Sequence, residues 1–256
     1  MTQDLGVVLP CAGSGTRLGA ARPKQFLDLG GRPVFHRSLT TFLAHPRVCS
    51  VALVVASSEI QQVRVDLGLY FGGFLGSGRL SVVEGGAERW ESVRNGVASL
   101  STQATLVAVH DVARPFLVPT DIDVVVSAAM EDGAATLALP AVDTIKRAGP
   151  DAEPQSGLGA DGRPLQAQER LGPLVETTLD RKRIWMVQTP QAFRREVLER
   201  CYRDLAREPG LAPTDEAGLA ETFGHSVRLV RGAERLRKIT SAEDLEWARW
   251  MVSRKS

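Results

Sequence analysis

The chain has few cysteines, no long apolar run and almost no net charge, and each absence removes a class of protein. Its 256 residues include three cysteines, Cys11, Cys49 and Cys201, which are widely spaced and form no Cys-x-x-Cys pair. Disulfides and thiolate metal sites are therefore not expected, and a reducing cytoplasm fits this usage. The opening residues contain neither a basic nor an apolar stretch, so we expect no secretion signal and no membrane anchor.

Positive and negative residues balance almost completely, with 31 Lys and Arg against 30 Asp and Glu and a net charge of +1. Such a chain has no overall field that attracts a polyanion, so nucleic acid is not an expected partner. Several catalytic signatures are also missing: Gly-Lys-Ser/Thr, Gly-x-Ser-x-Gly and His-Glu-x-x-His. The length suits a single large domain, which we place at residues 1–256.

What the sequence does contain is a glycine-rich segment directly after an apolar run near the N-terminus. Gly13 and Gly15 allow consecutive backbone N–H groups to turn toward an anion, and Arg17 and Lys24 add positive charge. The pattern predicts a nucleotide phosphate site. A glycine-rich turn between a strand and a helix, without a ligand, is the alternative.

Short apolar runs alternate with helical patterns along the first half of the chain. Residues 51–56, 80–83 and 105–109 have the composition of buried parallel strands, and residues 33–45 repeat apolar side chains at helical spacing. This alternation predicts an α/β fold with a single doubly wound, mostly parallel sheet.

Polar clusters follow three of the predicted strands, at residues 10–17, 84–92 and 110–115. Ligands of doubly wound sheets gather at the carboxyl ends of the strands. We therefore expect the three clusters to form one site. His110 and Asp111 are neighbours on an extended chain and point to opposite faces, so His110 is expected to be structural rather than part of a catalytic dyad.

Residues 148–173 interrupt this rhythm, because they are rich in glycine and proline and have almost no apolar periodicity. They predict a mobile loop. Strand-like pieces lie on both sides, at 136–146 and 174–188, so we expect a protruding β-arm over about 142–186. Exposed arms often pair between subunits, which makes a homodimer through the arm a hypothesis that light scattering can test.

The three clusters together resemble the 2-C-methyl-D-erythritol 4-phosphate cytidylyltransferases. The segments that carry the likeness are PCAGSGTR (10–17) with PKQ (23–25), GGAERWESV (85–93) and HDVARP (110–115). The likeness continues through DTIK (143–146), DR (180–181), QTPQ (188–191), TDEA (214–217) and KIT (238–240), and it covers nearly all of the chain except the 148–173 loop.

This resemblance implies a Rossmann-like nucleotidyltransferase fold and a cytidylyl transfer in non-mevalonate isoprenoid synthesis. CTP and the methylerythritol phosphate would give the CDP-alcohol and pyrophosphate, with Mg²⁺, in a dimer whose arm completes the neighbouring site. A phosphomonoester is already mostly dianionic near neutral pH, since its second pKa is about 6, so no general base is required. The protein's task is to hold two anions together with fixed cations and a metal.

The resemblance also assigns roles to individual residues. Arg17 and Lys24 match cations that stabilise the reacting triphosphate. The CTP-binding positions are Pro10, Cys11, Ala12, Gly13, Gly15, Gly86, Ser92 and Asp111. Within this set, Gly86 and Ser92 would select cytosine, and Asp111 is also the expected Mg²⁺ partner.

The second substrate is assigned to Arg114, Thr144, Arg181 and Lys238, of which Arg181 and Lys238 are also counted as catalytic. Arg181 would act in the partner's site because it follows the arm. The family's asparagine two residues before the lysine is missing here, so Arg237 is an alternative to Lys238 if the register slips by one.

Three other functions fit part of the pattern. A ribitol 5-phosphate cytidylyltransferase has the same motifs with a different polyol phosphate. An NAD-dependent oxidoreductase is disfavoured because Leu18 stands where the dinucleotide fingerprint needs its third glycine. A non-catalytic nucleotide sensor would bind CTP without releasing pyrophosphate, which the set of four cations argues against.

Overall fold

The computed structural model describes most of the chain, and the chain divides into two compact units. The described residues are 2–13, 23–149, 173–208 and 210–254. The first unit comprises Met1–Ala138 and Val187–Ser256, and the second comprises Leu139–Met186.

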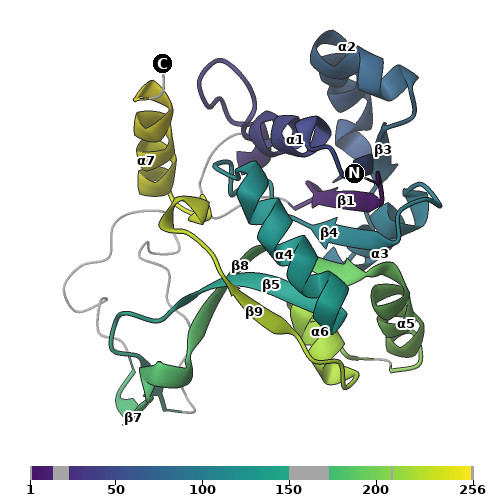
Figure 1. Ribbon diagram of the computed structural model, residues 1–256. Helices are drawn as coiled ribbons and strands as arrows, with labels where there is room; N and C mark the ends of the chain where they lie inside the picture. Colours follow the sequence, from purple (N-terminus) through teal and green to yellow (C-terminus); the bar gives the residue numbers. More distant parts are fainter. Residues whose placement is uncertain (1, 14–22, 150–172, 209, 255–256) are drawn as a thin grey trace. The chain divides into compact units, whose positions relative to one another are not determined.

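The central sheet has seven strands in the order β3-β2-β1-β4-β8-β5-β9 (Figure 1). Their bounds are β1 Leu5–Pro10, β2 Val48–Val55, β3 Leu80–Glu84, β4 Leu106–Val109, β5 Ala134–Pro140, β8 Trp185–Arg194 and β9 Arg228–Arg231. β1 pairs in parallel with both β2 and β4, and β2–β3 and β5–β9 are also parallel. β8 runs antiparallel to β4. The predicted α/β class with a mostly parallel sheet is confirmed.

Helices cover both faces of this sheet, so alternate strand residues enter two separate cores. Val7 and Leu9 of β1 pack on one face, whereas Val8 packs on the other. The first core is completed by α1 (Val34–Ala44), α2 (Ile60–Gly76) and α4 (Pro119–Asp132). The second is completed by α3 (Arg89–Ser99), α5 (Arg195–Leu205) and α6 (Glu216–Thr222). Burial on both faces explains why these strands are continuous apolar runs.

A third, smaller apolar cluster attaches the last helix to the loop after β4. Helix α7 (Ala242–Ser253) begins with a capping box between Ser241 and Asp244. Its Leu245 and Ala248 pack in a cluster with Phe116, whose ring meets the Trp247 ring edge to face at 5.4 Å between centroids. This cluster holds the segment before α7 close to the sheet.

Helices α2 and α4 were not predicted, although the sequence carries a signal for both. In α4, Ile122, Val125, Val126 and Ala129 are all fully buried at helical spacing. In α2, Val63, Leu67 and Phe71 repeat every four residues and face the core. β9, in contrast, is a four-residue strand with mostly exposed side chains and gives no such signal.

The second unit contains a two-stranded antiparallel sheet of β6 (Lys146–Ala148) and β7 (Val175–Thr178). The strand-like pieces predicted at 136–146 and 174–188 are each divided in two. The first is interrupted after Pro140, which lacks the N–H group that a central strand donates. The second is interrupted by the helical turn at Arg181–Arg183. The predicted mobile loop lies mostly at 150–172, outside the described residues.

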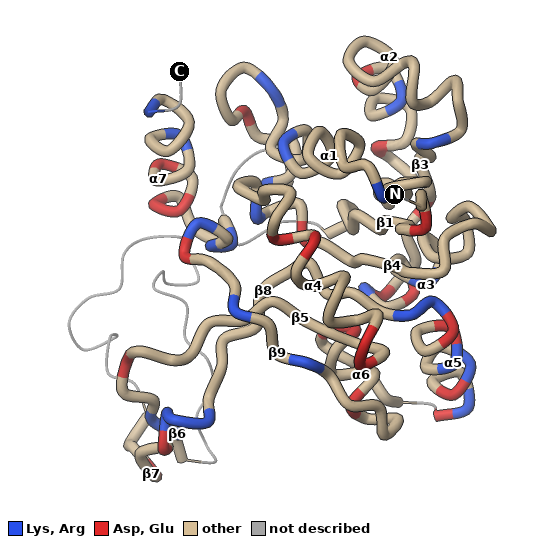
Figure 2. The backbone as a smooth tube through the Cα atoms, in the orientation of Figure 1, with Lys and Arg blue, Asp and Glu red and all other residues tan. Residues whose placement is uncertain are grey.

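Charge and cysteine placement agree with the composition. Figure 2 shows residues of both signs on α5 and on α7 rather than a segregation of one sign. All three cysteines are buried and unpaired, so the expectation of no disulfide is confirmed. None of the helices in the described part of the chain is long and apolar enough to cross a bilayer.

Candidate active site

A pocket of about 460 Å³ opens where the strand order reverses, at the carboxyl ends of β1 and β4. β1 lies between β2 and β4, so the chain leaves it to one side and returns on the other, and a crevice forms at this point. We name this cavity the active pocket. Its lining residues are Pro10, Cys11, Ala12, Gly13, Lys24, Gln25, Gly86, Ala87, Glu88, Arg89, Ser92, Asp111, Val112, Ala113, Lys238 and Thr240.

The loop after β1 is held by the side chain of Gln25, whose role sequence reasoning did not identify. Gln25 is buried and its Nε2 donates to the backbone carbonyl oxygens of Cys11 at 2.6 Å and of Gly13 at 2.9 Å. The N–H of Cys11 donates to Val54 O at 2.6 Å. Two carbonyl oxygens are therefore occupied by protein donors, which suits a loop whose other face receives an anion. Gly15 and Arg17 lie outside the described residues.

The segment after β3 is closed by its own hydrogen bonds. The N–H of Gly86 donates to Ser92 Oγ at 3.0 Å, and this hydroxyl donates to Glu88 O at 3.2 Å. A Cβ on Gly86 would lie 2.3 Å from Glu91 Cβ, so only glycine fits there. Ser92 lines the pocket and its hydroxyl fixes the loop, and its contact with cytosine stays a prediction.

Asp111, which follows β4, is surrounded by three cationic side chains. Its carboxylate lies 2.7 Å from Lys238 Nζ, 3.7 Å from Arg89 and 4.0 Å from Arg114. Burial opposes its charge, but Lys238, Arg89 and Arg114 outweigh burial and hold the pKa of Asp111 well below its ordinary value. The carboxylate is therefore ionised near neutral pH and positions Lys238 at the pocket wall.

Arg89 links this group to a second, more deeply buried carboxylate. Its Nη1 donates to both oxygens of Glu216 at 2.9 Å, and Glu216 is only 1% exposed. Burial works against the charge of Arg89, but Glu216 and Asp111 together raise its pKa. Burial raises the pKa of Glu216 as well. Glu216 was quoted within a motif but given no role, because 127 residues separate it from Arg89.

The Glu216 segment is attached to the sheet by Gln191 of β8. Gln191 Nε2 donates to Asp215 Oδ2 at 2.7 Å, and the N–H of Ala217 donates to Gln191 Oε1 at 3.0 Å. Asp215 caps α6 by accepting from the N–H of Gly218 at 2.8 Å. The family resemblance includes the separate segments 188–191 and 214–217. These hydrogen bonds join them into one unit, which contacts Arg89 through Glu216.

His110, which follows β4 directly, is fully buried and does not line the active pocket, whereas Asp111 does. Its Nδ1 lies 3.1 Å from Thr189 Oγ1, and its Nε2 lies 3.2 Å from both Ser38 Oγ and Arg114 O. Burial lowers the pKa of His110 to about 4. A neutral, fully bonded imidazole away from the pocket surface holds the loop in place.

The structure places three basic residues that the sequence singled out. Lys238 lines the active pocket, whereas Arg237 pairs with Asp244 of α7. Lys24 also lines the pocket, and its Nζ donates to Ile239 O at 3.0 Å. The register therefore places Lys238, not Arg237, next to Asp111.

Arg114 was predicted to contact the second substrate, and the structure places it beside the pocket rather than on its wall. Its Nη1 donates to Leu236 O at 2.7 Å and its Nη2 to Val187 O at 3.4 Å. These bonds connect the loop after β4 with two other segments. One is the segment before Lys238, and the other is the part of β8 that belongs to the first unit. Thr144 and Arg181 belong to the second unit, where Arg181 donates to Val142 O, and their roles stay predictions.

A divalent cation has one suitable ligand among the predicted residues. The described part of the chain contains no group of three or more His, Cys, Asp or Glu side chains that could hold a metal. Mg²⁺, however, commonly uses one or two carboxylates together with waters and substrate phosphates. Asp111 fits that pattern. The Cys11 thiol does not, because burial raises its pKa strongly.

Comparisons with known proteins agree with this geometry. The family model described as 2-C-methyl-D-erythritol 4-phosphate cytidylyltransferase matches residues 5–155 and 165–254. An enzyme of that name from Pelotomaculum thermopropionicum is 39% identical over 249 residues, which are 97% of this chain and 94% of the relative. A bifunctional IspD/IspF enzyme from Desulforudis audaxviator is 42% identical over 97% of this chain, but the chain spans only 56% of that longer protein.

Solved structures show the same fold. The crystal structure of 2-C-methyl-D-erythritol 4-phosphate cytidylyltransferase from Thermus thermophilus superposes with a TM-score of 0.69 at 27% identity. That match covers 98% of this chain and 99% of the solved chain. The Rossmann-like arrangement expected from the sequence is therefore confirmed.

Proposed function

The chain belongs to the 2-C-methyl-D-erythritol 4-phosphate cytidylyltransferase family, and we propose that it transfers CMP from CTP to 2-C-methyl-D-erythritol 4-phosphate. An oxygen of the phosphomonoester bonds to the α-phosphorus of CTP, the bond from that phosphorus to the bridging oxygen breaks, and pyrophosphate leaves. This would place the enzyme in non-mevalonate isoprenoid synthesis. The observation that carries the proposal is the active pocket, where glycine-rich backbone, Lys24, Arg89 and Lys238 line one cavity together with Asp111.

The pocket has the chemical character that this reaction needs. The attacking phosphate is already mostly dianionic, because its second pKa is about 6. The imidazole of His110 is buried and does not line the pocket, and the lysines and the arginine of the lining suit electrostatic stabilisation of phosphate charge. Lys24 and Lys238, together with Arg17, would hold the charge that develops on the triphosphate. The backbone N–H groups of Ala12, Gly13 and Gly15 would cradle its phosphates, since Pro10 has no N–H and the Cys11 N–H donates to Val54 O.

Recognition of the two substrates is divided between the pocket segments and the arm. Gly86 and Ser92 would form the side of the pocket that binds cytosine. There the hydrogen-bonded loop after β3 would present its backbone groups to the base. Arg114 would position the loop after β4 through its hydrogen bonds to Leu236 O and Val187 O. Thr144 and Arg181 would hold the methylerythritol phosphate, with Arg181 acting in the site of a partner subunit.

Asp111 would hold Mg²⁺ together with phosphate oxygens of CTP. When bound, the ion neutralises part of the triphosphate charge and orients the leaving group. Lys238 shares the Asp111 carboxylate at 2.7 Å, so the lysine remains close to the same phosphates.

A cytoplasmic homodimer is the assembly that best fits the second unit. Val142, Leu174 and Val175 are exposed apolar side chains on this unit, with 66%, 89% and 58% of their surface accessible. Exposed apolar side chains of this kind are typical of a surface that pairs with a second copy. A dimeric mass by light scattering is expected, and a monomeric mass would remove the partner's Arg181 from the mechanism.

Pyrophosphate release is the direct test of the reaction. The assay uses CTP with methylerythritol phosphate and, separately, with D-ribitol 5-phosphate, and we expect turnover of the former to dominate. Preference for ribitol phosphate would identify the related cytidylyltransferase, and CTP binding without release would identify a sensor. A rise in melting temperature with NADH but not CTP would support an oxidoreductase.

Neighbouring variants test the placement of the cation. Lys238→Met is expected to lower kcat/KM by about 100-fold or more, because it removes one charge donor from the reacting phosphates. Arg237→Met is the matched control, since Arg237 is 58% exposed and pairs with Asp244 outside the pocket. The reverse order of effects would place Arg237 at the substrate.

A further inference from the structure

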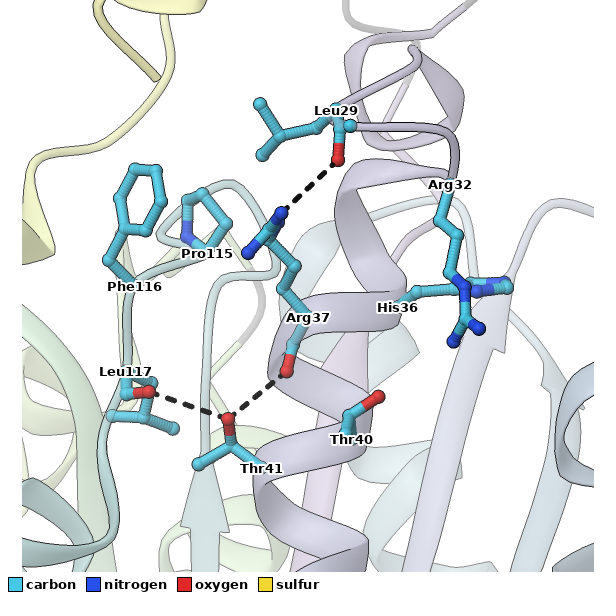
Figure 3. A pocket seen from close by; sticks show the side chains of 10 residues that line it. Leu29, Arg32, His36, Arg37, Thr40, Thr41, Pro115, Phe116 and Leu117 are labelled. Atoms are coloured by element: carbon cyan, nitrogen blue, oxygen red, sulfur yellow. Dashed lines mark hydrogen bonds between the residues drawn. The ribbon is translucent and has the colours of Figure 1, made fainter. Parts of the chain in front are cut away.

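The first unit contains a second pocket, of about 380 Å³, on the side of α1 that faces the loop after β4 (Figure 3). We name it the α1 pocket. Its lining residues are Leu29, Gly30, Arg32, His36, Arg37, Thr40, Thr41, Pro115, Phe116 and Leu117. None of them lines the active pocket, and the lining contains two arginines and no acidic side chain.

Arg37 is the most unusual residue of the α1 pocket, because part of its guanidinium is buried without a partner. Its Nε is buried and makes no hydrogen bond to any described residue, and its Nη2 has only a long contact of 3.5 Å to Leu29 O. Burial lowers the pKa of Arg37. Among the described residues no carboxylate lies at ion-pair distance from it. Buried charge is normally paired, so this guanidinium has room for an anionic partner.

The surroundings of Arg37 define what kind of anion fits. In Figure 3 the guanidinium lies between α1 and the loop that carries Pro115 and Phe116, and Arg32 lies beside His36. The Phe116 ring is 6.0 Å from the Arg37 guanidinium carbon. The pocket therefore offers the Arg37 guanidinium beside an apolar wall, while Arg32 lies over the Tyr70 ring at 4.9 Å.

Polar groups on α1 complete the lining. Thr40 is exposed and carries its hydroxyl at the pocket mouth, whereas Thr41 Oγ1 donates to Arg37 O at 3.1 Å. His36 is only 1% exposed, and its Nδ1 has no hydrogen-bond partner among the described residues, while its Nε2 contacts Asp66. The exposed Thr40 hydroxyl can donate to an acceptor oxygen of a ligand, whereas Thr41 Oγ1 already donates to the backbone and a neutral His36 bonded to Asp66 through Nε2–H presents an acceptor at Nδ1.

We propose that the α1 pocket binds an organic phosphate, namely a phosphomonoester dianion attached to a small apolar group. The dianion contacts Arg37, and the apolar group lies against Pro115 and Phe116. A volume of about 380 Å³ is within the range of small-molecule sites, roughly 300–1,000 Å³.

The position of the α1 pocket links it to the active pocket through two continuous segments. Leu29–Arg32 follows Lys24 and Gln25 within a few residues, and Pro115–Leu117 follows Asp111–Ala113 directly. Ligand binding on one side of these segments is therefore expected to change affinity on the other, by the same factor in both directions. The α1 pocket would then be a regulatory site.

Calorimetry with phenyl phosphate tests the site on the full chain, first without nucleotide and then with saturating CTP. Thr40→Glu places a carboxylate on an exposed position at the pocket mouth and leaves folding intact, and we expect it to abolish measurable binding. Thr40→Gln is its neutral control and is expected to bind like the parent. Equal affinities for the two variants would overturn the proposal, because the phosphate would then bind elsewhere.

A second pair of variants tests the guanidinium itself. Arg37→Gln is expected to weaken phenyl phosphate binding roughly 10- to 100-fold, the usual range for a lost charge-assisted hydrogen bond. Arg64→Gln on the exposed side of α2 removes the same charge outside the pocket and should have no effect. A similar loss in both variants would show non-specific attraction and reject the site. An unchanged dissociation constant in the presence of CTP would reject the regulatory link.

Discussion

Arg89 and Lys238 in the active pocket both lie at ion-pair distance from Asp111, whereas Arg32 and Arg37 in the α1 pocket face no carboxylate of the described residues. The two cavities differ little in volume, and the segments that form their walls are continuous with one another. In one, internal carboxylates fix the direction of each cation before a substrate arrives. In the other, Arg32 lies over the Tyr70 ring and Arg37 over the Phe116 ring, and neither has a carboxylate of the described residues at ion-pair distance. Paired charges give fixed geometry and unpaired charges give capacity for an anion.

The largest expected effect comes from removing a cation from the active pocket. Lys24→Ala leaves the triphosphate without one fixed charge, so we expect kcat/KM to fall about 100- to 1000-fold while the protein remains folded. Pyrophosphate release measures the rate and urea unfolding measures the fold. Arg64→Ala on the exposed side of α2 is the control and should turn over normally. Near-normal turnover of Lys24→Ala would exclude this lysine from the mechanism.

A second variant makes the active pocket resemble the α1 pocket by leaving Arg89 without its buried partner. Glu216→Gln removes one carboxylate charge, and we expect the free energy of unfolding to fall by about 2–3 kcal/mol. Urea titration at neutral pH measures the change. Glu199→Gln is matched to it, because Glu199 pairs with Arg195 at 2.7 Å but is 41% exposed, and should cost less than about 1 kcal/mol. Equal losses would mean that burial does not distinguish the two pairs.

The pH dependence of stability tests the buried His110, whose Nε2 lies 3.2 Å from Arg114 O in the loop after β4. Because burial lowers the pKa of His110 from 6.5 to about 4, the unfolded chain binds the proton more tightly than the folded chain. Stability from this group is therefore present above pH 6.5 and is lost as the pH falls toward 4. Between pH 7 and pH 5 we expect a loss of about 2 kcal/mol.

Urea unfolding at these two pH values measures that loss, and His110→Gln should show a flatter dependence. His225→Gln is the control, because His225 lies on the loop after α6 and lines neither pocket. If His110→Gln kept the parental slope, another group would be responsible for the acid sensitivity.

The smallest expected effect concerns the loop after β1. Gln25→Leu keeps the size of the side chain but removes both hydrogen bonds to the carbonyls of Cys11 and Gly13, and we expect KM for CTP to rise about tenfold with little change in kcat. Steady-state kinetics with varied CTP measure this. Gln62→Leu on the exposed face of α2 should leave both constants unchanged. A fall in stability with unchanged KM would limit Gln25 to a structural role.

Much of the fold could be predicted because it follows from local patterns. The buried strands are continuous apolar runs, and α1 and α5 repeat apolar residues at helical spacing. Three polar clusters at strand ends were expected to meet, and Gly13, Gly86 and Asp111 do line one pocket. Parallel strands end at the same edge of a sheet, so this convergence follows from the topology.

The contacts that set the site electrostatics could not be predicted in the same way. Lys238 reaches Asp111 across 127 residues, and Arg89 reaches Glu216 across the same separation. Arg114 lies in the expected segment, yet its guanidinium donates to backbone carbonyls rather than lining the pocket. The sequence contains the residue types in each case, but it does not specify which of several carboxylates or carbonyls a long side chain meets.

The sequence by itself determined the α/β class, the absence of disulfides and the segments that supply glycine and positive charge, because periodicity and composition act over a few residues. Only the tertiary structure decided that Lys238 rather than Arg237 stands beside Asp111, that Gln25 holds the loop after β1, and that Arg37 is left without a carboxylate among the described residues. Pairing of charges depends on distances of a few ångströms between segments far apart in the chain, and those distances exist only after the helices have packed on the sheet.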